Sequence, residues 1–179
     1  MKRRISTLKH HPAQQTIYPT IDTAVQSLAD NIALCGQLEP CLITKDSIII
    51  SGYTRIAALE LLGKKTCDVK VLDIPDEQQI YYMISSNKQR VKDYNVRLAE
   101  VDALTKYYSK GKGYRSDLNE PTTHQRHKRR KNTLEMVAAD LGMSKNTIHQ
   151  LKYIRNRRPD LIQHIGETIT LQSCYFQVR

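Results

Sequence analysis

Several features that define common protein classes are missing from this sequence. Its 179 residues include no Trp and one Phe, so ten Tyr supply nearly all of the aromatic side chains. Four cysteines form no C-x-x-C pair and have no His at ligand spacing, which argues against a metal site and predicts buried free thiols. No apolar run reaches 18 residues, and polar residues follow the basic "MKRR" start. We therefore expect a cytoplasmic protein without a signal peptide, a membrane partner or a metal ion.

Charge of one sign dominates only the second half. Residues 1–93 carry 12 Lys or Arg and 10 Asp or Glu, a balance of +2, whereas residues 94–179 carry 16 and 8, a balance of +8. The two balances add up to the net charge of +10. Basic charge concentrated in one half favours a polyanion such as nucleic acid as the partner of that half. A solvated basic surface without a partner is the alternative.

Apolar spacing predicts an α+β region followed by helices. Short apolar runs predict strands at 40–44 and 47–51, and alternation of apolar residues predicts a strand at 67–74. Helical spacing predicts helices at 23–36, 53–63, 76–90 and 96–111, then helical segments over 133–156 and around Gly166. The stretch between Lys110 and Asn132 has no periodicity and contains a basic run, so it is predicted to be a linker. The last helix reaches the end of the chain, as expected of a short protein or of a piece of a longer one.

The predicted organisation has four parts. Residues 1–16 are expected to be a polar N-terminal tail, and residues 17–93 the α+β domain. Residues 94–131 are expected to form a helix and a basic linker, and residues 132–179 a separate all-α domain.

The stretch "LEMVAADLGMSKNTIHQLKY" (134–153) has the spacing of a helix-turn-helix. Ala138 is small where two helices must approach, and Gly142 supplies the permissive backbone of a turn. Ile148 and Leu151 then fall where the second helix packs onto the first, and Ser144 can cap that helix. An ordinary pair of antiparallel helices is the alternative.

A helix-turn-helix predicts which side chains meet DNA. The N-terminal part of the second helix enters the major groove, where Asn and Gln pair with adenine and Lys with guanine, while other residues bind phosphate or sugar. The basic run 126–131 is expected to follow the DNA backbone or the minor groove, or else to be a solvated loop. His149 is either a base contact or an exposed polar residue. The predicted DNA-binding residues are Arg126, Lys128, Arg129, Arg130, Lys131, Ser144, Lys145, Asn146, Thr147, His149, Gln150, Lys152 and Arg155.

An ordered set of short motifs in the first half resembles the ParB/sulfiredoxin superfamily. The motifs are "GQLEP" (36–40), "SGYTR" (51–55), "LLGKKTCDVKVLD" (61–73) and "SNKQR" (86–90). With a helix-turn-helix downstream, the arrangement resembles the ParB branch over roughly residues 17–160. The resemblance implies an α+β N-terminal ParB/sulfiredoxin-like domain followed by an all-α helix-turn-helix domain.

The resemblance also implies a nucleotide site, with CTP in the ParB branch and ATP in sulfiredoxin. From the residues alone, a strand that ends at Gly52 and enters a helix presents free N–H groups to an anion, and Arg55 can bind phosphate oxygens. A salt-bridged Arg55 that stiffens the turn is the alternative. The predicted nucleotide-binding residues are Gly36, Glu39, Gly52, Tyr53, Thr54, Arg55, Asn87 and Arg90.

Two departures from the family pattern refine this expectation. Tyr53 and Thr54 stand where sulfiredoxin carries its catalytic cysteine, so sulfiredoxin activity is not expected. Ser86 stands where the family has an acidic residue before Asn87, so the magnesium ligand expected at that position is missing. We assign no catalytic residue.

The sequence therefore predicts a ParB-like protein that binds double-stranded DNA, with a CTP or ATP pocket as a switch. Plasmid or phage partition and transcriptional control are the expected settings, in the bacterial cytoplasm at the nucleoid. A homodimer is expected from the resemblance. A further alternative is a non-catalytic interaction module that recruits a partition ATPase or a methyltransferase. The alternative is a ParB-fold enzyme, namely a nucleotide hydrolase, small-molecule kinase or nuclease, which needs a carboxylate cluster. The candidate carboxylates are Glu39, Glu60, Asp68 and Asp73.

Overall fold

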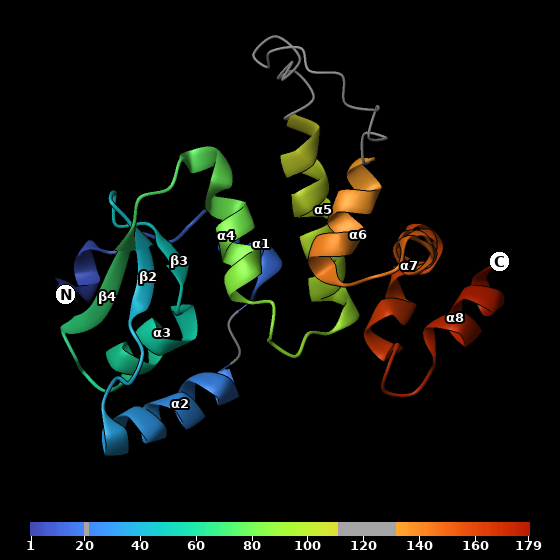
Figure 1. Ribbon diagram of the computed structural model, residues 1–179. Helices are drawn as coiled ribbons and strands as arrows, with labels where there is room; N and C mark the ends of the chain where they lie inside the picture. Colours follow the sequence, from blue (N-terminus) through green and yellow to red (C-terminus); the bar gives the residue numbers. More distant parts are fainter. Residues whose placement is uncertain (20–21, 111–131) are drawn as a thin grey trace, which may run out of the picture. The chain divides into compact units, whose positions relative to one another are not determined.

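The computed structural model describes residues 1–19, 22–110 and 132–179. It divides into two compact units, Met1–Gln89 and Arg90–Arg179 (Figure 1). The first unit combines a small sheet with helices, and the described part of the second is helical. This confirms the predicted order of an α+β domain followed by a helical region.

A four-stranded mixed sheet forms the centre of the first unit. Its order is β1-β4-β2-β3, in which β2 and β4 run parallel and the other two pairs run antiparallel. A tight turn in which Ser47 has a φ of 65° joins β2 to β3, as the short apolar runs on either side predict. The strands are β1 (Lys2–Arg4), β2 (Cys41–Thr44), β3 (Ile49–Ser51) and β4 (Thr66–Leu72).

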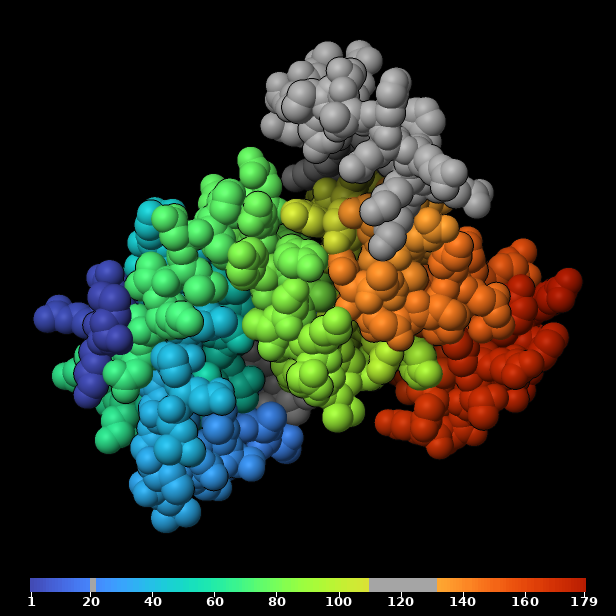
Figure 2. Space-filling model, viewed as in Figure 1, coloured from blue at the N-terminus to red at the C-terminus, as the bar shows by residue number. Residues whose placement is uncertain are grey.

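The N-terminal residues belong to the sheet and are not the polar tail expected for residues 1–16. Lys2 pairs with Asp68, and the N-terminal amine of Met1 donates to the carbonyl of Val69 at 3.1 Å. Ile5, which follows β1 directly, is buried in the core. Three exposed basic residues give β1 no apolar alternation, so only its pairing with β4 reveals it. Its side chains lie at the surface, in dark blue in Figure 2.

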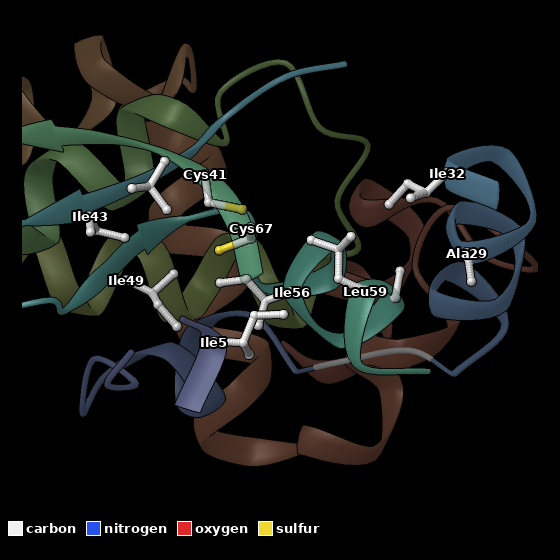
Figure 3. Packing of buried hydrophobic residues seen from close by; sticks show 11 residues of the cluster. Ile5, Ala29, Ile32, Cys41, Ile43, Ile49, Ile56, Leu59 and Cys67 are labelled. Atoms are coloured by element: carbon white, nitrogen blue, oxygen red, sulfur yellow. The ribbon is translucent and has the colours of Figure 1, made fainter. Parts of the chain in front are cut away.

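The core of the first unit lies between the sheet and two helices, α2 (Asp22–Cys35) and α3 (Tyr53–Leu61) (Figure 3). The inward-facing residues of β4, Cys67 and Val69, alternate with more exposed ones, as the period of a strand requires. Cys35 is exposed at the end of α2, which corrects its predicted burial, whereas the other three cysteines are buried. The core residues are Ile5, Ala29, Ile32, Cys41, Ile43, Ile49, Ile56, Ala58, Leu59, Cys67 and Val69.

A further helix, α4 (Gln79–Ser86), packs against β3. Ile50 is fully buried although its neighbour Ile49 belongs to the core around α3, because successive strand side chains point to opposite faces. The helix predicted over 76–90 is shorter: a 3-10 turn, η2 (Asp76–Gln78), precedes α4, and the helix ends at Ser86. Two short elements, η1 (Ile5–Thr7) and α1 (Gln14–Ile17), precede α2.

In the second unit, a long helix packs against a set of shorter ones. Helix α5 (Tyr94–Lys110) contacts α6 (Thr133–Leu141) and α7 (Lys145–Arg157), so the helix expected at the start of 94–131 belongs to this unit. The remaining elements are η5 (Pro159–His164) and α8 (Leu171–Val178), both packed on α7. The buried residues are Leu98, Val101, Leu104, Val137, Ala138, Met143, Ile148, Leu151, Ile154, Ile162, Ile165 and Cys174.

Polar side chains fix the helix ends of the second unit. Asn132 and Glu135 form a reciprocal capping box at the start of α6, and the Ser144 hydroxyl accepts from the Thr147 N–H at the start of α7. A buried ion pair joins Lys92 to Glu100 of α5, with 2.6 Å between Nζ and Oε1. In the part of the chain that the structure describes, no helix is long and apolar enough to cross a membrane.

Candidate functional site

A glycine in the left-handed conformation forms the turn between β3 and α3. Gly52 has a φ of 103°, a backbone conformation that favours glycine. A Cβ at this position would lie 2.8 Å from the Sγ of Cys41, so the turn also lacks room for a side chain. Helix α3 begins at the next residue, and the N–H groups of its first turn have no partner within the helix. The turn therefore offers oriented donors to an anion.

Arg55 lies in the first turn of α3 and bonds to Glu39, which precedes β2. Its Nη2 donates to the Glu39 Oε2 at 3.1 Å, and the exposed side-chain fractions are 21% for Arg55 and 78% for Glu39. The salt-bridged alternative for Arg55 is thus realised in this structure. A guanidinium that donates to a carboxylate in this way can donate to a phosphate oxygen with the same geometry, so Arg55 is compatible with either role.

Gln37 positions the loop that carries Glu39, and the sequence analysis missed it. Its amide accepts from the Asp68 N–H at 2.8 Å and donates to the Asp68 carbonyl at 2.8 Å and to the Glu39 carbonyl at 2.9 Å. The side chain thereby joins this loop to β4. Gln37 lies inside the "GQLEP" motif, so its position in that motif could have indicated its role. Gly36, with a φ of 74°, ends α2 immediately before it and has open space around its Cα.

Tyr53 supports the turn from within the unit. Its hydroxyl donates to the Ile49 carbonyl at 2.6 Å and accepts from the His11 N–H at 3.0 Å. Burial raises the pKa of Tyr53 to about 12, with the His11 bond acting weakly in the opposite direction. Both hydrogen bonds are made within the unit, so the Tyr53 hydroxyl stabilises the turn. A direct contact of this hydroxyl with a nucleotide stays a prediction. Thr54, the next residue, is half-buried.

Two buried thiols lie behind the turn. The Sγ of Cys41 is 3.8 Å from the Gly52 carbonyl oxygen, and Cys67 lies beside it in the core (Figure 3). Burial raises the pKa of Cys41, and the nearby Arg55 offsets this only in part. Burial also raises the pKa of Cys67, to about 11. Both thiols are therefore neutral near pH 7 and act as core residues.

The predicted second arm of the nucleotide site is divided between the two units. Asn87 lies just after α4, and its Nδ2 donates to the Met83 carbonyl at 2.9 Å, so the amide caps its own helix. The Ser86 hydroxyl donates to the same carbonyl at 2.9 Å. Arg90 is the exposed first residue of the second unit. Gly36, Glu39, Gly52, Tyr53, Thr54 and Arg55 thus lie on segments of the first unit that meet around the turn.

In the second unit, α6 and α7 are joined by a short turn at Gly142, whose φ is 62° (Figure 1). Val137, Ile148 and Leu151 are fully buried, and Ala138 is nearly so. The spacing read from the sequence therefore places these four side chains in one core. The opposite side of α7 is polar, and its first half carries the predicted base contacts.

The predicted DNA contacts on the first half of α7 differ in exposure and in whether they bond to other side chains. Asn146 and His149 are exposed, and Gln150 is partly so. The Ser144 hydroxyl and Thr147 bond to each other across the cap, with 2.8 Å between the two hydroxyl oxygens. Lys145 pairs with Glu135 of α6, at 3.0 Å between Nζ and Oε1. Two polar side chains, Asn146 and His149, therefore project most freely.

Further along α7, Lys152 and Arg155 face an acidic partner. Both approach Asp102 of α5, at 3.9 Å for the Lys152 Nζ and 2.5 Å for the Arg155 Nη1. The phosphate role predicted for these two residues therefore competes with an internal carboxylate. The predicted basic contacts at 126–131 lie outside the described residues.

Comparison with known proteins identifies the first unit. Residues 3–88 match the model of the ParB N-terminal domain. The first unit is a ParB N-terminal domain. The match begins within β1, includes the Gly52 turn and ends just after Asn87, so it covers nearly the whole unit. A search of the curated proteins finds no match to the chain.

Solved ParB structures have the same fold. Two structures of a pNOB8-like ParB N-domain match with TM-scores of 0.67 and 0.64, at 15% and 16% identity, and cover 98% of this chain and 77% and 72% of theirs. The C-terminally truncated partitioning protein ParB from Caulobacter crescentus, complexed to the centromeric parS site, matches with a TM-score of 0.56. Its identity is 18%, over 98% of this chain and 82% of that one. At these identities the likeness establishes the fold.

The chemistry available at the ParB-domain turn is anion binding. The described residues contain no group of three His, Cys, Asp or Glu side chains placed to hold a metal ion. Glu60, a candidate carboxylate of the enzyme alternative, is exposed on α3, and Glu39 is engaged by Arg55. The turn therefore presents one guanidinium and a set of backbone N–H groups, which suits a phosphate group.

Proposed function

We propose that this protein binds double-stranded DNA in a sequence-specific manner, with α6 and α7 acting as a helix-turn-helix. The observation that carries the proposal is the α6–Gly142–α7 arrangement. It buries Ile148 and Leu151 against α6 and leaves Asn146 and His149 exposed on the first half of α7. In helix-turn-helix proteins this part of the second helix lies in the major groove. Asn146 and Gln150 then have the chemistry to recognise adenine.

Two further observations support DNA as the partner. The charge of residues 94–179 is +8, from 16 basic and 8 acidic residues, so this region attracts a polyanion. The Caulobacter ParB that shares the fold is complexed to its centromeric DNA site. Partition or transcriptional control, at the nucleoid in the cytoplasm, is the setting we propose on these grounds. A homodimer that binds a two-fold symmetric site, and a partition ATPase or a methyltransferase as a further partner, belong to the same proposal.

A selection from random duplexes, followed by binding at several salt concentrations, tests this function. The chain should enrich a defined sequence, and Asn146→Ala should lower its affinity for that sequence by about 1–3 kcal/mol while leaving random DNA unaffected. Lys145→Ala should also lower the affinity for that sequence, because Lys145 is a predicted guanine contact. Gln163→Ala is the matched control because Gln163 is also exposed but lies in η5. Equal enrichment of all sequences, or no effect of Asn146→Ala, would disprove groove reading by α7.

For the first unit we propose a nucleoside triphosphate, CTP or ATP, as the ligand of the Gly52 turn. The close approach of Gly52 to Cys41 and the forked cation at Arg55 support a phosphate there. Isothermal titration with CTP, ATP and GTP, with and without Mg²⁺, tests the pocket. Arg55→Ala should lower the affinity at least tenfold, as expected when a charge-assisted hydrogen bond is lost. If the variant binds as tightly as the original chain, Arg55 is not the phosphate ligand.

The enzyme alternative makes a separate prediction in the same assay. A nucleotide hydrolase should release phosphate above background, and replacing Glu39 or Glu60 by Gln should abolish that release if either is the catalytic carboxylate. Binding without phosphate release supports a switch.

A further inference from the structure

The carboxylate of Asp102 lies against Lys152 and Arg155, the two residues on the second half of α7 that the sequence predicts to bind DNA phosphate. Arg155 meets it with both terminal nitrogens, Nη1 at 2.5 Å from Oδ2 and Nη2 at 3.4 Å from Oδ1. Lys152, one helical turn earlier on the same face, lies 3.9 Å from Oδ1. Such a fork around a carboxylate has the geometry that arginine also uses for phosphate.

The scaffold holds this contact in place. Asp102 follows the fully buried Val101 on α5, and α7 packs against α5 through its own buried residues, which include Leu151 and Ile154. The backbone of the acid and that of its partners are therefore fixed by the core. The side chains themselves are about one-third to one-half exposed, at 48% for Asp102, 33% for Lys152 and 36% for Arg155. Pairs with this exposure contribute little to stability, so the role of Asp102 can be tested by replacing it.

The same pairing changes the charge that α7 offers to DNA. The helix carries four basic residues and no acidic one, namely Lys145, Lys152, Arg155 and Arg157. Asp102 faces two of them and Glu135 a third, while Arg157 lies over the Tyr153 ring at 3.9 Å. Phosphate contacts supply affinity without sequence information, whereas base contacts supply specificity. Withholding cations from the phosphates therefore raises the share of binding that depends on sequence.

We propose that Asp102 is a specificity-determining residue that keeps Lys152 and Arg155 from binding the DNA backbone. This inference rests on the proposed DNA-binding function. The sequence predicts that Lys152 and Arg155 bind DNA. In this proposal Asp102 neutralises their charge, so they do not contribute to DNA binding in the original chain. The chain then binds random DNA more weakly than its charge suggests.

The test measures binding of the full chain to random-sequence duplex between about 0.05 M and 0.2 M salt. Asp102→Asn should bind more tightly than the original chain and should steepen the plot of log affinity against log salt by about 1.8, from two additional phosphate contacts at about 0.9 each. Across that fourfold salt range, the variant's affinity should change roughly twelvefold more than that of the original chain. Discrimination between the selected sequence and random DNA should fall.

Asp30→Asn is the matched control. It makes the same change of charge on an exposed aspartate of the first unit, whose side chain accepts a bond from Gln26. It should leave the salt slope unchanged. If Asp102→Asn behaves like Asp30→Asn, Asp102 has only a structural role and the proposal is wrong.

Asp102→Asn could strengthen DNA binding in two ways: it frees Lys152 and Arg155 to bind phosphate, and it removes a negative charge that repels DNA. Replacing the two basic residues distinguishes these effects. In the Asp102→Asn background, Lys152→Gln with Arg155→Gln should return the slope to its original value, and persistence of the steeper slope overturns the proposal. In the original background, the same pair of changes should alter the slope by less than one. This second measurement does not require Asp102→Asn to fold. If the double variant of the original chain has a salt slope that is lower by about 1.8, the proposal is also wrong. If the original chain binds no duplex at low salt, the DNA-binding function itself fails.

Discussion

Arg55 and Glu39 meet across 16 residues of sequence, with 3.1 Å between Nη2 of the guanidinium and Oε2 of the carboxylate. The contact joins the start of α3 to the loop before β2. The carboxylate of Glu39 therefore contacts Arg55, the residue that we propose to bind phosphate. The two sites proposed for this protein thus share one feature, since an internal carboxylate occupies the arginine in each of them.

Replacing Glu39 by Gln should strengthen nucleotide binding. Its carboxylate lies close enough to Arg55 to repel a phosphate there, and at an exposed site such repulsion costs about 1 kcal/mol, or roughly fivefold in affinity. Stability should change by less than about 1 kcal/mol, because Glu39 is 78% exposed. Titration with CTP and ATP measures the effect. Glu60→Gln, an equal change of charge on the exposed side of α3, is the control, and equal affinities of the two variants would contradict the assignment.

Replacing Gly52 by Ala should destabilise the first unit by about 2–4 kcal/mol. The φ of 103° strains any other residue, and the new Cβ would lie 2.8 Å from the Cys41 Sγ. Gly63→Ala is the matched control because Gly63 has a φ of 67° with nothing within 4 Å, so it should cost only about 1–2 kcal/mol. Urea unfolding measures both. Cys41→Ala should recover part of the loss, and equal costs at Gly52 and Gly63 would show that the contact with Cys41 is relaxed.

Tyr53 should make stability fall at high pH. Its folded-state pKa is about 12 against the ordinary value of 10.0 for tyrosine, so folding favours the protonated phenol. That stabilisation is complete below about pH 10 and is lost as the pH rises from 10 to 12. Tyr53→Phe should lower the unfolding free energy by about 1–2 kcal/mol at neutral pH, through the loss of two hydrogen bonds, and should reduce the decline above pH 10.

Chemical unfolding at a series of pH values measures this difference. Tyr82→Phe, at a more exposed ring, keeps the hydrogen bonds of Tyr53 and should keep the original decline. If Tyr53→Phe declines as steeply as the original chain, the Tyr53 phenol is not responsible.

The Lys92–Glu100 pair should matter far more than the surface pairs. Both side chains are nearly buried, at 8% and 2% exposed. Glu100→Gln leaves the Lys92 ammonium buried without its anion and should cost about 3–5 kcal/mol, whereas the double change Lys92→Met with Glu100→Leu should recover most of it. Thermal and urea unfolding provide the measurement. Lys45→Met, which breaks an exposed pair with Asp73, should lower the unfolding free energy by less than about 1 kcal/mol. If it costs as much as Glu100→Gln, burial does not explain the importance of the Lys92–Glu100 pair.

Local pattern was sufficient for much of the fold. Short apolar runs located β2 and β3, and alternation located β4. Helical spacing located α2, α3, α5 and the α6–α7 pair to within a few residues. Gly52 was identified from sequence because a strand that turns directly into a helix requires a backbone that few other residues adopt. Ala138, Gly142, Ile148 and Leu151 were identified because spacing along two helices fixes which faces can pack.

Tertiary structure alone decided which groups face each other. The sequence contains no signal that Lys2–Arg4 pairs with β4, since a three-residue exposed strand has no period, and its partner lies more than 60 residues away. Likewise, Tyr53 uses its hydroxyl inside the unit, Gln37 bonds to β4, and Asp102 holds Lys152 and Arg155. Periodicity determines the face on which a side chain lies, because it follows from local backbone geometry. The charge or hydrogen-bond partner on that face comes from a distant segment, and only the packing of the elements brings it there.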